Sequence, residues 1–283
     1  MAIPADPSVN SIIVEGMNEG GQYAITNGSA AHTAFKNNQF QTLKTELWSA
    51  CKTDTLLETE TCRIASAYTS AITLPTDFDS EIRVILYDAP SDSRGTSQAG
   101  GAATITLAST FSADATAVQG SMIFITGGTG SGQYGQILAY NNSTKLATLT
   151  ANWATPPDNT STYLVATTHI DLAREDYVKP YTANQRPRWY SRVGTTLVVN
   201  PPGDQLYPLL ILYRSNLTQL DETGTLLVKH LRERRSLWIA GIKYKTAERY
   251  DDDRAVKWKA EWEQAKMEYR AENTVLTRAE GYR

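Results

Sequence analysis

Charge is distributed very unevenly along this chain, and no other feature constrains its fold as strongly. The 73 residues from Thr96 to Thr168 contain only three charged side chains, whereas the 55 residues from Lys229 to Arg283 contain 24. A contrast of this size between segments argues against one evenly built domain. The sequence therefore predicts a nearly uncharged module in the middle of the chain and a charged segment at its C-terminus.

The uncharged stretch has the pattern of β-strands. Apolar and polar residues alternate in short runs, and Gly, Asn and Pro separate one run from the next. The runs lie at 103–107, 121–126, 136–140, 145–150 and 161–165. Fifteen of the 35 threonines fall in this stretch, and threonine favours the pleated surface of a sheet. We predict an inserted all-β sandwich or barrel domain at 97–168.

The segments on either side of the module indicate an α+β core. Apolar residues at helical spacing predict a helix over about 33–57, and extended runs occur both before and after the module. The predicted fold is a helical bundle, built from N- and C-terminal helices, on a small β platform. Its parts are an N-terminal arm at 1–30, core segments at 31–96 and 169–225, the module at 97–168, and C-terminal helices at 226–283.

Two apolar stripes mark the C-terminal segment as helical. Leu227, Leu231, Trp238 and Ile242 form the first stripe. Ala255, Trp258, Trp262, Ala265 and Tyr269 form the second, at spacings of 3, 4, 3 and 4, which is typical of a narrow coiled-coil-like seam. Such a seam is either core of the same chain or a contact between subunits, and the spacing leaves both alternatives open.

A basic cluster begins the same segment. Arg232, Arg234 and Arg235 fall within one predicted helical turn, and the tail from Lys229 onward carries a net charge of +4. Arginines grouped in this way can face phosphate or an acidic partner. The alternative is a solvated helix face on which Glu233 pairs with its neighbours.

Catalytic and metal-binding patterns are not evident. Gly130 to Gly135 matches the GxGxxG pattern, but a strand-like run follows it, and no acidic residue occurs between Asp114 and Asp158. A dinucleotide site needs a helix and an acidic residue there, so we expect a glycine-rich β-hairpin. The three histidines and two cysteines lack metal-ligand spacing. We therefore predict a protein that is not an enzyme and binds no cofactor or metal.

Bulk composition excludes other classes. With 41% apolar and 20% charged residues, the chain is not compositionally disordered, and a net charge of −3 argues against a strongly basic nucleic-acid binder. The longest apolar run, Tyr207 to Tyr213, is too short to span a bilayer. The N-terminus has no basic and apolar signal-peptide pattern, so no membrane partner is expected.

Taken in order, several blocks of the flanking segments resemble the head-to-tail adaptor (connector) proteins of tailed bacteriophages. The blocks are Leu74–Phe78, Arg186–Tyr190, Leu197–Asp204, Tyr207–Arg214, Leu226–Leu231, Trp238–Ala247 and Arg249–Arg254. Together with the segments around them they cover about 150 residues, and the resemblance lies in their order rather than in any one block. Parts of the inserted stretch, Ile123–Gln133 among them, resemble a small β module that recurs in phage virion proteins.

The adaptor resemblance implies a ring, usually a dodecamer, bound beneath the portal protein in the neck of the virion. Such a ring, made in the host cytoplasm, joins the portal to a downstream tail or nozzle protein. Genome DNA passes through its channel without specific binding. The terminal helix of the family commonly inserts into the portal, which makes a portal or subunit interface the expected role of the C-terminal candidates. These are Arg232, Arg234, Arg235, Trp238, Trp258, Trp262 and Tyr269.

A different class of function also fits the sequence. The polar β module could belong to a tail or decoration protein that holds a host-surface carbohydrate. A ring with a central hole is expected of the adaptor. A monomer or trimer that binds glycan is expected of the alternative.

Overall fold

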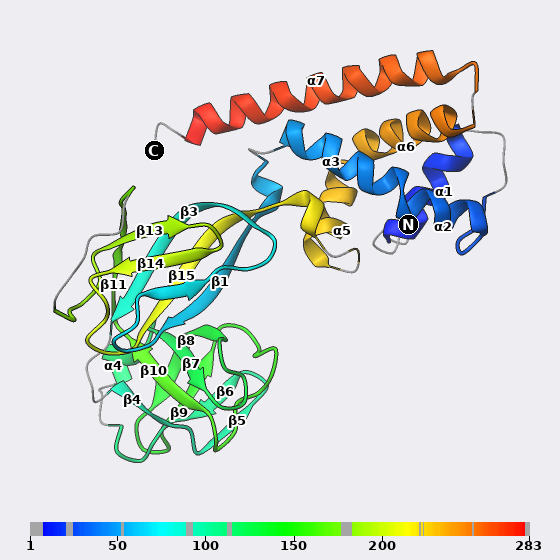
Figure 1. Ribbon diagram of the computed structural model, residues 1–283. Helices are drawn as coiled ribbons and strands as arrows, with labels where there is room; N and C mark the ends of the chain where they lie inside the picture. The colour runs from blue at the N-terminus through cyan, green and yellow to red at the C-terminus, as the bar shows by residue number, and fades with distance from the viewer. Residues whose placement is uncertain are drawn as a thin grey trace. The chain divides into compact units, whose positions relative to one another are not determined.

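The chain folds into a mixed α+β structure with helices towards both ends and strands between them (Figure 1). The computed structural model describes residues 8–20, 25–51, 54–88, 93–111, 115–176, 183–220, 222, 224–250 and 252–280. The chain divides into two compact units. The helical unit comprises Met1–Thr59, Thr76–Ser80 and Arg214–Arg283, and the β unit comprises Glu60–Pro75 and Glu81–Tyr213.

Helices from both ends of the chain share one hydrophobic core in the helical unit. The helices are α1 (Val9–Gly20), α2 (Ala30–Asn37), α3 (Gln39–Cys51), α5 (Thr225–Glu233), α6 (Arg235–Arg249) and α7 (Ala255–Glu280), with short 3-10 turns η1 (Thr55–Leu57) and η3 (Leu217–Gln219). Their core includes Ile12, Met17, Phe40, Leu47, Leu231, Trp238, Trp262 and Tyr269. Segments more than 200 residues apart thus depend on each other for burial.

Two N-terminal expectations need correction. Residues 9–20, which were expected to belong to an arm, form α1, because Val9, Ile12, Ile13 and Met17 lie on one helical face and are buried. The helix expected over 33–57 is instead α2, α3 and η1. The break lies at Asn38, which caps α2 by donating its backbone N–H to the Phe35 carbonyl.

Helix α1 approaches α6 closely through two glycines one turn apart. A Cβ atom on Gly20 would lie 2.8 Å from the Lys243 Cα, and one on Gly16 would lie 2.6 Å from the Ile242 Cγ2. Contacts this short do not occur in packed proteins, so a side chain at either position must push the helices apart. Backbone cannot move aside as a flexible side chain can, which makes Gly20 the stricter of the two positions.

We expect the Gly20→Ala substitution to lower the free energy of unfolding of the helical unit. Overpacking costs about 1–3 kcal/mol, which outweighs the gain of up to about 1 kcal/mol from the better helix propensity of alanine. Urea denaturation measures the difference. Ser11→Ala, on the exposed part of the same helix, is the matched control and should change stability much less. Equal stability of Gly20→Ala and the wild type would contradict the close approach.

The predicted β module corresponds to a seven-stranded antiparallel sheet in the β unit. Its strands are β4 (Arg94–Thr96), β5 (Ala99–Gly101), β6 (Thr104–Thr106), β7 (Met122–Gly127), β8 (Tyr134–Asn141), β9 (Leu146–Leu149) and β10 (Thr162–Ala166), in the order β4-β10-β7-β8-β9-β6-β5. The short helix α4 (Ala115–Val118) lies between β6 and β7. Alternating inward residues such as Ile105, Ile125 and Tyr163 form the core of the module.

The GxGxxG segment joins β7 to β8 in an antiparallel pair, as the hairpin prediction required. Gly128, Gly130 and Gly132 adopt positive φ there.

The rest of the β unit consists of two four-stranded sheets. One has the order β1 (Glu58–Ala65), β15 (Tyr207–Ser215), β3 (Phe78–Asp88) and β11 (Thr168–Asp171). The other has the order β12 (Ala173–Arg174), β13 (Trp189–Val193), β14 (Thr196–Asn200) and β2 (Ala71–Thr73). Each sheet combines strands from before and after the module, which is the arrangement predicted for an insertion into a core sheet.

The module shares a hydrophobic cluster with the first of these sheets. Phe124, Leu164 and Ala166 of the module are buried with Cys62 and Leu210 of the sheet. The Phe124 ring also lies 4.8 Å from the ring of Tyr87, between centroids. The module is therefore part of the packing of the β unit and does not form a compact unit of its own.

Candidate functional site

The three arginines of the basic cluster do not share a face. Helix α5 ends at Glu233 and α6 begins at Arg235, so Arg234 is the junction between two helices. Arg232 pairs with Glu233 at 3.1 Å, Arg235 pairs with Glu15 of α1, and Arg234 turns inward. The prediction that they present charge together from one helical turn is wrong, because the helix breaks within the cluster.

The aromatic candidates are mostly interior. Trp238 and Trp262 are fully buried and Tyr269 is 4% exposed, all within the core of the helical unit. Gly241 of α6 lets Trp262 and Leu43 come close, since a Cβ there would lie 3.0 Å from Trp262 Cζ3. These three side chains are covered by their own chain, which corrects the expectation that they face a portal or neighbouring subunit. The seam of α7 packs against α3 and α6.

Trp258 is the exception among the aromatic candidates. Its side chain is half-buried, and its ring lies 5.0 Å from the ammonium nitrogen of Lys243 on one hand and of Lys257 on the other. Cations over an indole face are favourable contacts. Trp258 therefore remains accessible at the edge of α7, in a basic environment.

A buried polar cluster joins α5, α6 and α7 to the segment before β1. Asp54 and His230 are fully buried, and the His230 Nε2 lies 3.3 Å from the Asp54 Oδ2. The Trp238 indole N–H donates to His230 Nδ1 at 3.0 Å. Because indole is only a donor, Nδ1 must be the acceptor, and the imidazole proton sits on Nε2, which faces Asp54. The Tyr269 hydroxyl donates to the same carboxylate.

The carboxylate of Asp54 stays ionised inside this cluster. Burial alone raises its pKa, but hydrogen bonds from His230, Tyr269 and the backbone N–H of Leu56 outweigh burial and lower the pKa to about 2. The guanidinium of Arg234 approaches the same oxygen, with Nε at 3.6 Å. Arg234 also binds Glu272 of α7 at 3.0 Å, so the cluster continues to the surface.

The Asp54–His230 pair resembles part of a catalytic triad only in composition. Neither side chain is exposed, and the side-chain groups of His230 and Tyr269 are bound to other members of the cluster. No reacting group can reach a site closed in this way. The arrangement instead stabilises the attachment of α7, because Tyr269 supplies one hydrogen bond and Glu272 one ion pair.

Three of the predicted interface residues, Arg234, Trp238 and Tyr269, thus meet in this cluster. The two residues at its centre, Asp54 and His230, were not among the candidates. They lie 176 positions apart, and no local pattern links them. Asp54 and Tyr269 are further apart still.

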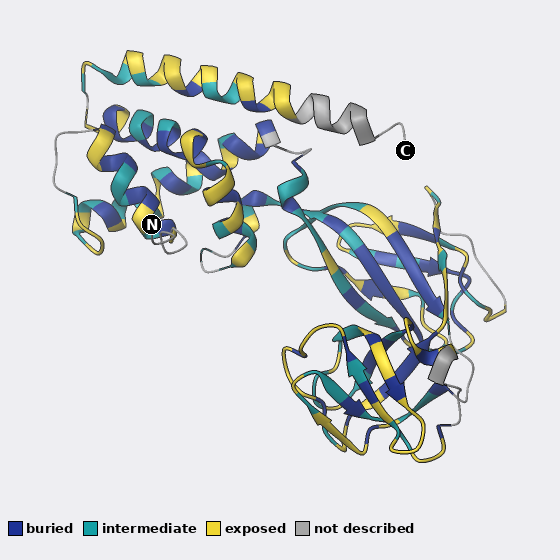
Figure 2. Ribbon diagram, turned by 180° about the vertical axis from the view of Figure 1, so that it is seen from behind, coloured by how far each residue is buried: buried dark blue, intermediate teal, exposed yellow. Residues whose placement is uncertain are grey.

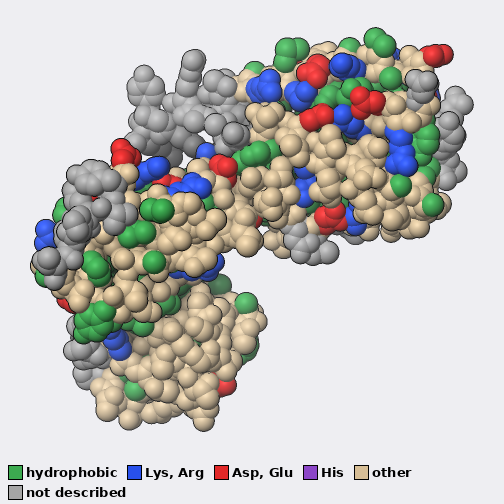
Figure 3. All heavy atoms as spheres, in the orientation of Figure 1, with side chains coloured by type: hydrophobic (Ala, Val, Ile, Leu, Met, Phe, Trp, Pro, Cys, Tyr) green, Lys and Arg blue, Asp and Glu red, His purple; other side chains and the backbone are tan. Residues whose placement is uncertain are grey.

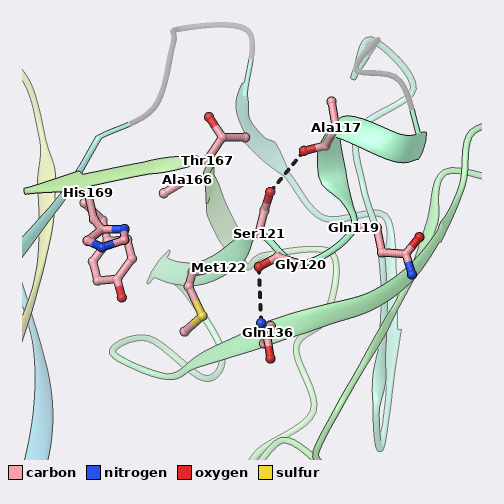
Figure 4. A pocket seen from close by; sticks show the side chains of 10 residues that line it. Ala117, Gln119, Gly120, Ser121, Met122, Gln136, Ala166, Thr167 and His169 are labelled. Atoms are coloured by element: carbon pink, nitrogen blue, oxygen red, sulfur yellow. Dashed lines mark hydrogen bonds between the residues drawn. The ribbon is translucent and has the colours of Figure 1, made fainter.

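One pocket of the β unit lies between its first four-stranded sheet and the module (Figure 4). It has a volume of about 500 Å³, and Tyr87, Ser121, Gln136 and His169 are among its lining residues. The Ser121 hydroxyl donates to the Ala117 carbonyl at 3.2 Å, and the Gln136 amide donates to the Gly120 carbonyl at 3.3 Å. Ser121 is therefore bonded to backbone and is not activated by His169.

A second opening of the β unit has both aromatic and polar walls. It measures about 360 Å³ and is lined by Glu60, Gln133, Tyr134, Asn152 and Trp153, among others. The Tyr134 hydroxyl donates to the Glu60 carboxylate, and burial together with that carboxylate raises the Tyr134 pKa. Trp153 is only 6% exposed, so little of its ring is open to a ligand.

Charged side chains are concentrated on the helical unit. On the face that Figure 3 shows, Lys, Arg, Asp and Glu gather over that unit, and the module shows few of them. Within the described ranges no group of three or more His, Cys, Asp or Glu side chains could hold a metal ion. Among the described helices, none is both long and apolar enough to cross a bilayer.

No protein-family model matches this chain, and no curated protein matches it.

Proposed function

We propose that this chain is a structural head-to-tail adaptor of a tailed bacteriophage. It forms a ring, a dodecamer as is usual for the family it resembles, that joins the portal protein to a tail or nozzle protein in the virion neck. The observation that carries the proposal is the order of the seven sequence blocks that resemble the adaptor family. The segments that hold these blocks lie in the terminal helices and in the sheets built around the module.

Two features of the molecule support this proposal. N-terminal helices α1 and α3 share one core with α5, α6 and α7, and this packing of helices from both ends of the chain is compatible with an adaptor. The polar cluster around Asp54 and His230 is buried and holds helices together. Both features fit a protein whose role is to assemble.

Electron microscopy of the negatively stained, purified chain tests the proposal, alone and after addition of the portal protein of the same phage. We expect rings with a central hole, because the channel must pass the genome. Portal belongs in the experiment because an adaptor can stay monomeric until it meets its partner. Single particles without a hole, in both samples, would contradict the proposal.

The proposal predicts only weak binding to duplex DNA. A channel that gripped phosphates would slow the genome, and the chain carries a net charge of −3. We expect a Kd weaker than about 1 µM at physiological salt, independent of sequence. Fluorescence anisotropy with two unrelated duplexes measures both properties. Nanomolar affinity for either duplex would contradict a passive channel.

A carbohydrate-binding tail or decoration protein is the second candidate. The opening lined by Tyr134, Trp153, Glu60 and Asn152 favours it, since aromatic rings and polar groups together are suited to a sugar. This candidate comes second because little of the Trp153 ring is exposed to a sugar.

A further inference from the structure

Helix α7 carries a second stripe on the side opposite its buried seam. Val256, Ala260, Met267 and Ala271 recur at spacings of 4, 7 and 4, so they lie along one face of the helix. All four are exposed, and the exposed fractions of Val256 and Met267 reach 81% and 61%. Figure 2 shows the corresponding alternation of buried and exposed residues along α7. Two large apolar side chains, Val256 and Met267, are thus open to solvent along this face.

Charges of opposite sign flank this stripe. Residues seven positions apart share a helix face, and Lys259 and Lys266 are such a pair, as are Glu261 and Glu268. The basic flank consists of Lys259, Lys266 and Arg270, with Glu263 bound to Lys266 at 2.7 Å. The acidic flank consists of Glu261, Glu268 and Glu272, of which Glu272 also binds Arg234 at 3.0 Å, with Lys257 beside the stripe. The flanks therefore carry opposite net charge.

We propose that the outward face of α7 is an interface between copies of this chain, in which two α7 helices lie side by side and parallel. In that orientation the basic flank of one helix meets the acidic flank of the next, and the stripes of neighbouring helices lie on the same side of the contact. An antiparallel pair related by a two-fold axis would place like flanks together, which is unfavourable. The charge pattern thus selects both the occupant and its direction.

The same pattern disfavours other occupants. Duplex DNA or an anionic membrane would be repelled by the acidic flank, and an acidic protein would be repelled in the same way. A second α7 offers a complementary flank on each side without any further component. This inference rests on the proposed function, because parallel copies repeated around an axis are what a ring requires.

Two charge-reversed variants and their mixture test the interface. Glu261→Lys/Glu268→Lys makes both flanks basic, and Lys259→Glu/Arg270→Glu makes both acidic. Each variant alone should lose self-association by about tenfold or more, because like charges now meet. An equimolar mixture should recover it, since an all-basic helix then meets an all-acidic one. Glu233→Lys/Asp253→Lys and Lys229→Glu/Arg232→Glu, which change the net charge equally elsewhere in the helical unit, are the matched controls and should associate as the wild type does.

Sedimentation velocity over a range of protein concentrations measures association, and microscopy of the same samples shows rings. Recovery in the mixture but not in either variant supports the interface. If both variants form the same rings as the wild type, the α7 interface is overturned and the adaptor proposal is left intact. Pairs without rings, abolished by charge reversal, would support the interface and contradict the adaptor. A wild type that is monomeric at every concentration would overturn the interface, and portal-induced rings would then decide the adaptor separately.

Discussion

Replacing Asp54 with alanine is expected to lower the free energy of unfolding of the helical unit by about 3–5 kcal/mol. The substitution leaves the buried His230 N–H and the Tyr269 hydroxyl without their shared acceptor, and the guanidinium of Arg234 without its nearest inward carboxylate. Buried groups that lose a partner cost far more than the bond itself contributes. Urea denaturation followed by tryptophan fluorescence measures the change, since Trp238 and Trp262 lie in this unit.

The control for this variant is Asp253→Ala, which removes an exposed carboxylate from the same unit and should change stability by less than about 0.5 kcal/mol. Equal stability of Asp54→Ala and Asp253→Ala would show that the buried cluster does not hold the helices.

Acid should reduce the difference between the wild type and Asp54→Ala. The folded state lowers the Asp54 pKa from 3.8 to about 2, so its contribution to stability is fully present above pH 3.8 and is lost as the pH falls towards 2. Denaturation curves recorded between about pH 5 and pH 2 should therefore converge. A difference that stays constant over this range would contradict an ionised Asp54 as the source of the stabilisation.

Truncation after Asp253 should unfold the helical unit and leave the β unit folded. The deletion removes Trp262 and Tyr269 from the core and exposes the surface of α3 and α6 that they cover. Loss of a single buried tryptophan costs about 3–5 kcal/mol. Since globular domains are stable by only about 5–15 kcal/mol, losing Trp262 and Tyr269 together should unfold a unit of ordinary stability. Far-UV circular dichroism should show a loss of helix much larger than the deleted residues account for.

Asp253→Ala, which changes the exposed residue at the truncation point and keeps α7, is the control, and it should leave the helical signal and the unfolding transition unchanged. If the remaining helices of the truncated chain melt as they do in the full chain, the seam of α7 is not needed as core. The seam would then be a contact surface for a partner. Failure of the truncated chain to bind portal would not locate a portal site, because the unit that carries the candidates is unfolded. Point substitutions on the exposed face of α7 are the variants suited to locating a portal-binding site.

The sequence predicts strands of the β module well, because strand patterns are local, but it does not predict that the module packs into the β unit instead of forming a compact unit of its own. Alternation in runs such as 121–126 and 161–165 becomes β7 and β10, and the near absence of charge distinguishes the stretch from its surroundings. Helix α1 was also recoverable: Val9, Ile12, Ile13 and Met17 have helical spacing.

The helical unit shows where local pattern is insufficient. The spacing of Trp258, Trp262 and Tyr269 predicts a stripe, but an intramolecular core and a subunit contact require the same spacing. Only the fold shows that α3 and α6 cover it. The helix break at Arg234 has no Pro or Gly to mark it, so the three arginines seemed to share a turn. Asp54 and His230 are brought together entirely by tertiary packing.

The most direct test of the adaptor account is the mass of the assembly that the full chain forms in the presence of its portal protein. Mass photometry should find, on portal or alone, a closed assembly of many 31.2 kDa chains, with a dodecamer as the expected size. A chain that remains monomeric with portal, or a trimer that binds glycan, would contradict it.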